Sequence, residues 1–107
     1  NECGMNLHRP IRAVDLSDDA RANVARVQEI WADCASRYGK EGPFLFGAFG
    51  CADAMFAPVV HRFCSYAIEV RDEARPYYDA MMSLPAFQEW TRAGLVETLV
   101  IERFETV

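Results

Sequence analysis

The sequence lacks a concentrated basic segment, a long apolar run and a signal-peptide pattern. Its formal net charge is −5, whereas binding to nucleic acid or to an acidic membrane surface needs a concentrated basic face. A membrane-spanning helix needs about 20 consecutive apolar residues, and a secretory signal needs a basic start followed by an apolar core. We therefore expect a cytoplasmic protein with neither nucleic acid nor a membrane as its partner.

Closely spaced cysteine pairs are also missing. The four cysteines, at positions 3, 34, 51 and 64, include no CxxC motif. Two disulfides stay possible on count alone, but a chain with 51% apolar residues has enough core to fold without them, and we favour reduced thiols. His61 and Cys64 form an HxxC pair without a second pair, and zinc needs at least three protein ligands. We predict no metal site.

No self-sufficient catalytic site is evident either. A glycine-rich phosphate loop is absent, since Gly47 and Gly50 precede an apolar segment without a nearby lysine. Cys51 lies at the expected start of a helix, where the positive end of the helix dipole favours a thiolate. Burial among apolar neighbours would have the opposite effect, so we favour a packing role for Cys51. No catalytic residue is predicted.

What the sequence does contain is a central apolar stretch, Phe44 to Phe63. A helix that is hydrophobic on nearly every face belongs in the middle of a domain. Gly50 is placed as its N-cap, and Asp53 follows at the third helical position, where its carboxylate can accept from the backbone N–H of the cap. We interpret Gly50 and Asp53 as structural capping residues.

Other helices flank this stretch on both sides. Ser17 to Tyr38 has an N-cap serine, two aspartates in its first turn, an apolar stripe at steps of three and four residues, and Gly39 as its stop. A third helix starts near Arg71 to Glu73, and a fourth starts at Pro85, where Phe87 and Trp90 should anchor it to the core.

The two ends of the chain are less regular. The first segment, up to Val14, is interpreted as the end of an incomplete helix with a bend at Pro10. Residues 95–107 are expected to form a short helical extension and an extended tail. The sequence thus predicts an all-α fold: a single helical domain, residues 1–107, built as a bundle of about five helices.

Three motifs resemble the C-terminal helical domain of glutathione S-transferases. They are GxxGxADAMFAPVVxRF at residues 47–63, LPAFQEW at residues 84–90, and NECGMNLHRPI at the start. In that family the central helix opens with Ser or Thr followed three residues later by Asp. Asp53 matches the acidic residue, whereas Gly50 stands where the hydroxyl residue is usual. The resemblance covers nearly the whole chain.

The resemblance implies a C-terminal domain that supplies substrate-pocket and interface surface in a two-domain enzyme. Its parent would conjugate or reduce small apolar electrophiles with glutathione, which is bound by a thioredoxin-like N-terminal domain that also carries the thiol-activating residue. A homodimer is expected, and this chain alone should be inactive and bind no cofactor. The family's pocket residues point to Met5, Asn6 and Arg9 as candidate substrate-binding residues; ordinary packing at a helix end is the alternative.

A second hypothesis is a non-catalytic, transferase-like helical interaction module within a protein assembly. The first residue is not methionine and the first helix has no cap, and both observations favour the C-terminal domain of a longer enzyme. If the N-terminal domain is missing, an apolar surface should be exposed or covered by self-association.

Overall fold

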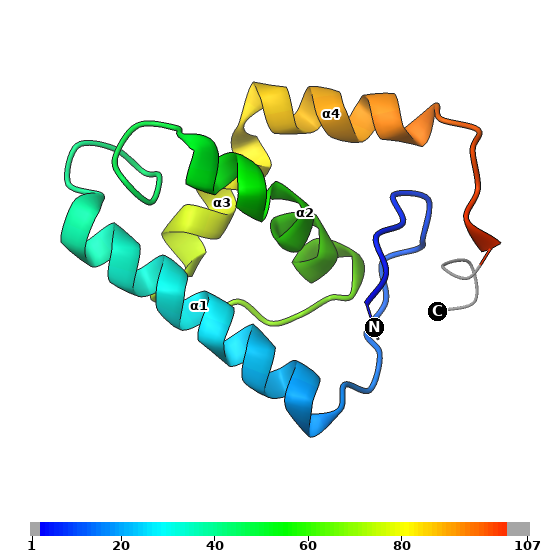
Figure 1. Ribbon diagram of the computed structural model, residues 1–107, viewed down its shortest axis with the longest axis horizontal. Helices are drawn as coiled ribbons and strands as arrows, with labels where there is room; N and C mark the ends of the chain where they lie inside the picture. Colours follow the sequence, from blue (N-terminus) through cyan, green and yellow to red (C-terminus); the bar gives the residue numbers. More distant parts are fainter. Residues whose placement is uncertain (1–2, 103–107) are drawn as a thin grey trace.

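The computed structural model describes residues 3–102. That part of the chain contains four α-helices (Figure 1): α1 Asp18–Tyr38, α2 Cys51–Ser65, α3 Arg75–Ser83 and α4 Pro85–Leu95. The prediction of an all-α fold is confirmed, with four helices in place of about five. Among the described residues, no helix is both long and apolar enough to cross a bilayer.

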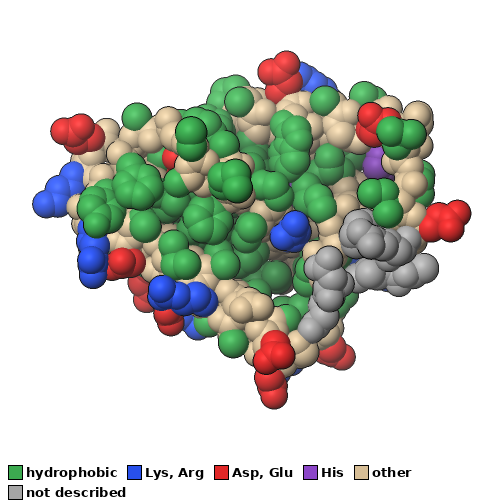
Figure 2. Space-filling view, viewed as in Figure 1, with side chains coloured by type: hydrophobic (Ala, Val, Ile, Leu, Met, Phe, Trp, Pro, Cys, Tyr) green, Lys and Arg blue, Asp and Glu red, His purple; other side chains and the backbone are tan. Residues whose placement is uncertain are grey.

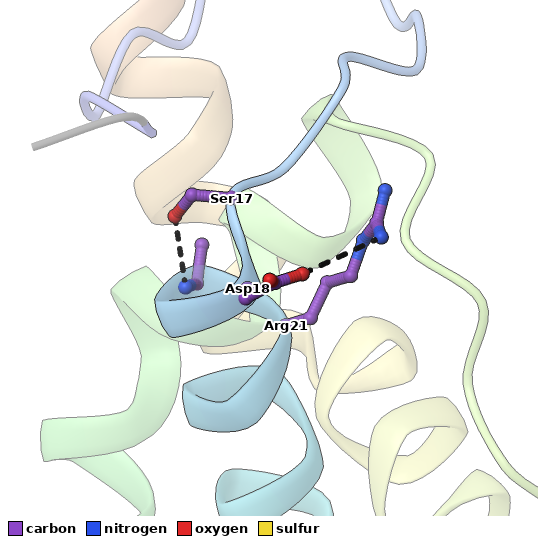
Figure 3. A network of polar contacts seen from close by, with 4 residues as sticks. Ser17, Asp18 and Arg21 are labelled. Atoms are coloured by element: carbon purple, nitrogen blue, oxygen red, sulfur yellow. Dashed lines mark hydrogen bonds and ion pairs between the residues drawn. The ribbon is translucent and has the colours of Figure 1, made fainter.

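The longest helix, α1, begins and ends where the sequence indicates. The Ser17 hydroxyl oxygen accepts a hydrogen bond of 3.2 Å from the backbone N–H of Ala20, which satisfies one of the unpaired donors of the first turn. Asp18 and Arg21 form an exposed ion pair of 4.0 Å beside this cap (Figure 3). Gly39 ends the helix by donating its N–H to the carbonyl of Ala35.

The core is centred on Trp31 of α1, which has no exposed surface. Its ring lies 5.1 Å from that of Phe63 in α2 and 5.2 Å from that of Tyr77 in α3, measured between centroids. Phe56 meets the same ring edge-on at 5.8 Å. Three helices therefore share one aromatic cluster, and Val60 and Met81, both fully buried, extend it.

The central helix is only half buried, which corrects the expectation of a helix enclosed on all sides. Its second half contributes Val60 and Phe63 to the core. In its first half, by contrast, the side chain of Met55 is 78% exposed. No described segment covers the outer face of that half, which lies between the loop after α1 and α4 (Figure 1).

The first segment is not helical, so the predicted helix end is absent from residues 3–16. Gly4 and Pro10 disfavour a helix there. The segment instead makes long-range hydrogen bonds with the end of α2. The backbone N–H of Arg12 donates to the carbonyl of Ser65 at 3.2 Å, and the Tyr66 hydroxyl donates to the carbonyl of Gly4 at 2.9 Å.

The C-terminal helices differ slightly from the prediction. α3 begins at Arg75, after a turn formed by the three residues before it, and Pro76 occupies its first turn. Phe87 is buried as expected, but Trp90 is 39% exposed. α4 ends at Leu95 without the expected helical extension, and residues 97–101 are irregular. The last part of the predicted tail lies outside the described residues.

Candidate functional site

The start of α2 is fixed by the carboxylate of Asp53, which has no exposed surface. One oxygen, Oδ2, accepts a 2.8 Å hydrogen bond from the backbone N–H of Gly50. The other, Oδ1, accepts a 3.3 Å bond from the N–H of Leu45, eight residues earlier. A single side chain therefore closes the helix start and also holds the preceding loop against it, which supports the structural role assigned to this residue.

Only half of the reciprocal capping pair exists, because Gly50 has no side chain to accept from the helix. Asp53 also lies close enough to Tyr77 of α3 to affect it, although no well-formed hydrogen bond joins them. Burial, assisted by this neighbouring carboxylate, raises the pKa of Tyr77, and the phenol therefore stays neutral at physiological pH.

Restoring the missing half of the cap should stabilise the domain. The backbone of Gly50 is extended, at φ −141° and ψ −174°, and an added Cβ would meet nothing closer than Asp53 Oδ2 at 4.0 Å. We expect Gly50→Ser to raise the free energy of unfolding by about 0.5 kcal/mol. Gly50→Ala, which adds the carbon without an acceptor, should be about 1 kcal/mol less stable than the serine variant. Urea denaturation measures both, and equal stabilities would contradict the missing-cap interpretation.

An apolar groove lies between α2 and α4. It has a volume of about 380 Å³, and its lining residues are all apolar: Phe49, Ala54, Ala57, Pro58, Met81, Leu84, Ala86, Phe87 and Trp90. The Phe87 and Trp90 rings pack edge to face, with centroids 5.6 Å apart. Because its lining residues are apolar and include no acid, base or nucleophile, the groove offers contact area and carries no chemistry of its own.

The groove is one part of a larger apolar face. Two further apolar side chains are exposed: Phe46, in the loop before α2, is 56% exposed, and Met55, in the first half of α2, is 78% exposed. Figure 2 shows apolar side chains gathered over the loop after α1 and over α2 and α4, with most charged groups towards the rim. A continuous exposed apolar surface of this kind is typical of a docking surface. We call Phe46, Phe49, Met55 and the groove lining the apolar face.

The predicted substrate-binding residues are not brought together in one pocket. Met5 and Asn6 line a hollow against the end of α4, near Gly94, and the Asn6 side chain accepts a hydrogen bond from the N–H of His8 within its own turn. Arg9 lines a different hollow. A substrate-binding role for the three residues stays a prediction.

Arg9 is a buried residue at the C-terminal end of α2, with 7% of its surface exposed. Its guanidinium donates to the backbone carbonyls of Pro10, Arg12 and Ser65, and lies 4.0 Å above the ring centroid of Tyr66. A cation that binds the last carbonyls of a helix also complements the helix dipole. These contacts assign Arg9 a structural role at this helix end.

His61 lies inside the protein. It is 8% exposed, its Nδ1 lies 3.0 Å from the hydroxyl oxygen of Ser65, and its ring stacks on Phe87. Burial lowers its pKa, which keeps the imidazole neutral at physiological pH. The serine four residues later was the available signal, because residues at that spacing share a helix face.

The described residues contain neither a disulfide nor a cluster of metal ligands. All four cysteines are free thiols, and Cys51 is exposed at the start of α2 instead of packed as expected. Within residues 3–102, no three side chains of the His, Cys, Asp and Glu types come close enough to hold a metal ion. The HxxC pair of His61 and Cys64 therefore has no third described ligand.

Comparison with known proteins gives one finding. The sequence model of a family described as "Glutathione S-transferase, C-terminal domain" matches residues 17–93, which include all four helices up to the last turn of α4. No curated protein and no solved structure matches the chain.

Proposed function

The chain belongs to the glutathione S-transferase C-terminal domain family, and on this basis we propose that it is the helical half of a two-domain glutathione transferase. In this proposal a thioredoxin-like domain covers the apolar face, binds glutathione and supplies the group that activates its thiol. The helical domain contributes apolar surface to the pocket for a small electrophile. The parent then conjugates or reduces that electrophile, and the chain alone is inactive.

The observation that carries the proposal is the apolar face. The Met55 side chain is 78% exposed in the half of α2 that is not buried. Covering it with another surface would be favourable by about 25 cal/mol per Å² of apolar area buried. A partner domain of the same protein covers such a surface permanently. Family membership suggests which domain that is.

The decisive experiment starts from the gene product as cells make it. Its intact mass is measured first, and its rate of glutathione conjugation to an aryl halide is then compared with that of the 107-residue chain. We expect a product of at least about twice the mass, active in conjugation, and an inactive chain. A product no larger than the chain would overturn the enzyme proposal and favour the non-catalytic interaction module.

The exposure of the apolar face makes a separate prediction. A neutral apolar dye such as Nile red should fluoresce in the presence of this chain, and Met55→Gln should reduce that fluorescence. Because the Met55 side chain makes few contacts, the free energy of unfolding should change by less than about 0.5 kcal/mol. Glu29→Gln, on the exposed side of α1, is the control and should leave the fluorescence unchanged. Equal fluorescence from the two variants would show that the dye does not report this face.

We also propose that the full protein is a homodimer and that it is cytoplasmic. Self-association through the family's interface would give a homodimer, which light scattering on the full product tests directly. Four free thiols among the described residues fit a reducing compartment, in keeping with a cytoplasmic enzyme.

A further inference from the structure

A second hollow, of about 460 Å³, opens at the opposite end of α2 from its cap. Four segments line it: the N-terminal segment, the last turns of α2, the end of α3 and one face of α4. Leu7 packs so closely on α4 that a Cβ at Gly94 would overlap it. These contacts place the N-terminal segment beside the second half of α4 (Figure 1). The volume is within the range of small-molecule sites.

The lining of this hollow combines apolar walls with a few polar groups. Leu7, Ile11, Met82, Phe87 and Leu95 supply the apolar surface. Gln88, Thr91 and Arg92 come from one face of α4, and His61 and Ser65 come from α2. Convergent polar groups on an apolar wall are typical of ligand sites and distinguish this hollow from the wholly apolar groove.

Two of the polar groups are available to a ligand. Arg92 makes no ion pair or hydrogen bond with another described residue. His61 uses Nδ1 on Ser65, while Nε2 has no partner within residues 3–102 and is not sealed inside the protein. No carboxylate is among the described residues of the lining, although the chain as a whole has a net charge of −5. The local charge therefore favours an anion.

We propose that this hollow binds a small carboxylic acid with an aliphatic or aromatic body. The apolar walls take the body of the ligand, the Arg92 guanidinium pairs with its carboxylate, and His61 Nε2 provides a further polar contact. A charge-assisted hydrogen bond to a guanidinium is stronger than one between neutral groups. The charge of the head group, in addition to apolar area, thus contributes to affinity. The site is built from this chain alone and goes beyond the transferase proposal.

The test uses octanoate and its neutral analogue octanol, titrated into the chain by calorimetry and by amide NMR. We expect octanoate to bind about tenfold more tightly than octanol, which corresponds to about one charge-assisted contact. The amide signals of Gln88 and Thr91 should shift. Equal affinities, no binding of either probe, or shifts confined to the apolar groove around Ala57 would overturn the proposal.

Two variants separate the head-group contact from general apolar binding. Arg92→Gln, at an exposed position, should remove the tenfold preference for octanoate and leave octanol binding unchanged. Arg75→Gln is the matched control, because Arg75 is an exposed arginine paired with Asp79 in α3 and does not line the hollow. A preference for octanoate that survives Arg92→Gln, or that Arg75→Gln also abolishes, would contradict the assigned contact.

Discussion

Replacing Asp53 with alanine is expected to lower the free energy of unfolding by about 3 kcal/mol, a large share of the 5–15 kcal/mol typical of a domain. The carboxylate accepts from two backbone N–H groups, those of Gly50 and Leu45. Alanine leaves both donors without a partner, and an unsatisfied buried donor costs about 1–3 kcal/mol. Urea denaturation followed by far-UV circular dichroism measures the loss.

The control for this prediction is Asp33→Ala, the same substitution at an exposed position. Asp33 pairs with Arg37 at 2.9 Å on the surface of α1, with 57% of its side chain exposed, and such pairs contribute about 0.5 kcal/mol or less. Asp53→Asn, which keeps one acceptor oxygen, should lose about half as much as alanine and provides a measurement if the alanine variant does not fold. Similar losses for Asp53→Ala and Asp33→Ala would refute the role of the buried carboxylate.

The largest expected effect is that of Trp31→Ala, a loss of about 4 kcal/mol. Trp31 is fully buried and contacts the rings of Phe56, Phe63 and Tyr77. Its removal leaves a cavity where three helices meet, and neighbouring helices cannot close such a cavity without moving apart from their other contacts. The measurement is again the free energy of unfolding, obtained from urea denaturation.

Trp90→Ala is the matched control for the tryptophan, because Trp90 is 39% exposed and should cost less than half as much. Trp31→Phe should cost about 1–2 kcal/mol, since the smaller ring leaves a smaller cavity and also removes the buried Nε1–H, which has no hydrogen-bond partner among residues 3–102. Equal losses of unfolding free energy in Trp31→Ala and Trp90→Ala would contradict the assignment of Trp31 to the centre of the core.

The helices themselves were largely predictable from local signals. Ser17 and Gly39 mark the ends of α1, and Gly50 and Asp53 mark the start of α2, because caps act within one turn of the chain. Pro85 likewise marks the start of α4. The aromatic cluster follows from the apolar stripe of α1. Each of these inferences depends only on residues near one another in the sequence.

Burial and pockets were less predictable, because they depend on which elements meet. Met55 and Trp90 are as apolar as any core residue, yet the fold leaves both exposed. His61 is a polar residue of the kind usually found at the surface, but α4 covers it. The N-terminal segment resembled a helix end until its partners were known, and these lie more than fifty residues away in the chain. The spacing of apolar residues in one sequence predicts local structure but not such long-range contacts.

The attachment of the N-terminal segment to the end of α2 has a kinetic consequence. Its hydrogen bonds join residues separated by 56 and 62 positions, and closing loops of that length is entropically costly and slow compared with helix formation. The segment should therefore dock after the helices have formed, as one of the last events in folding. It should also be among the first to detach, in local opening events that leave the aromatic core intact.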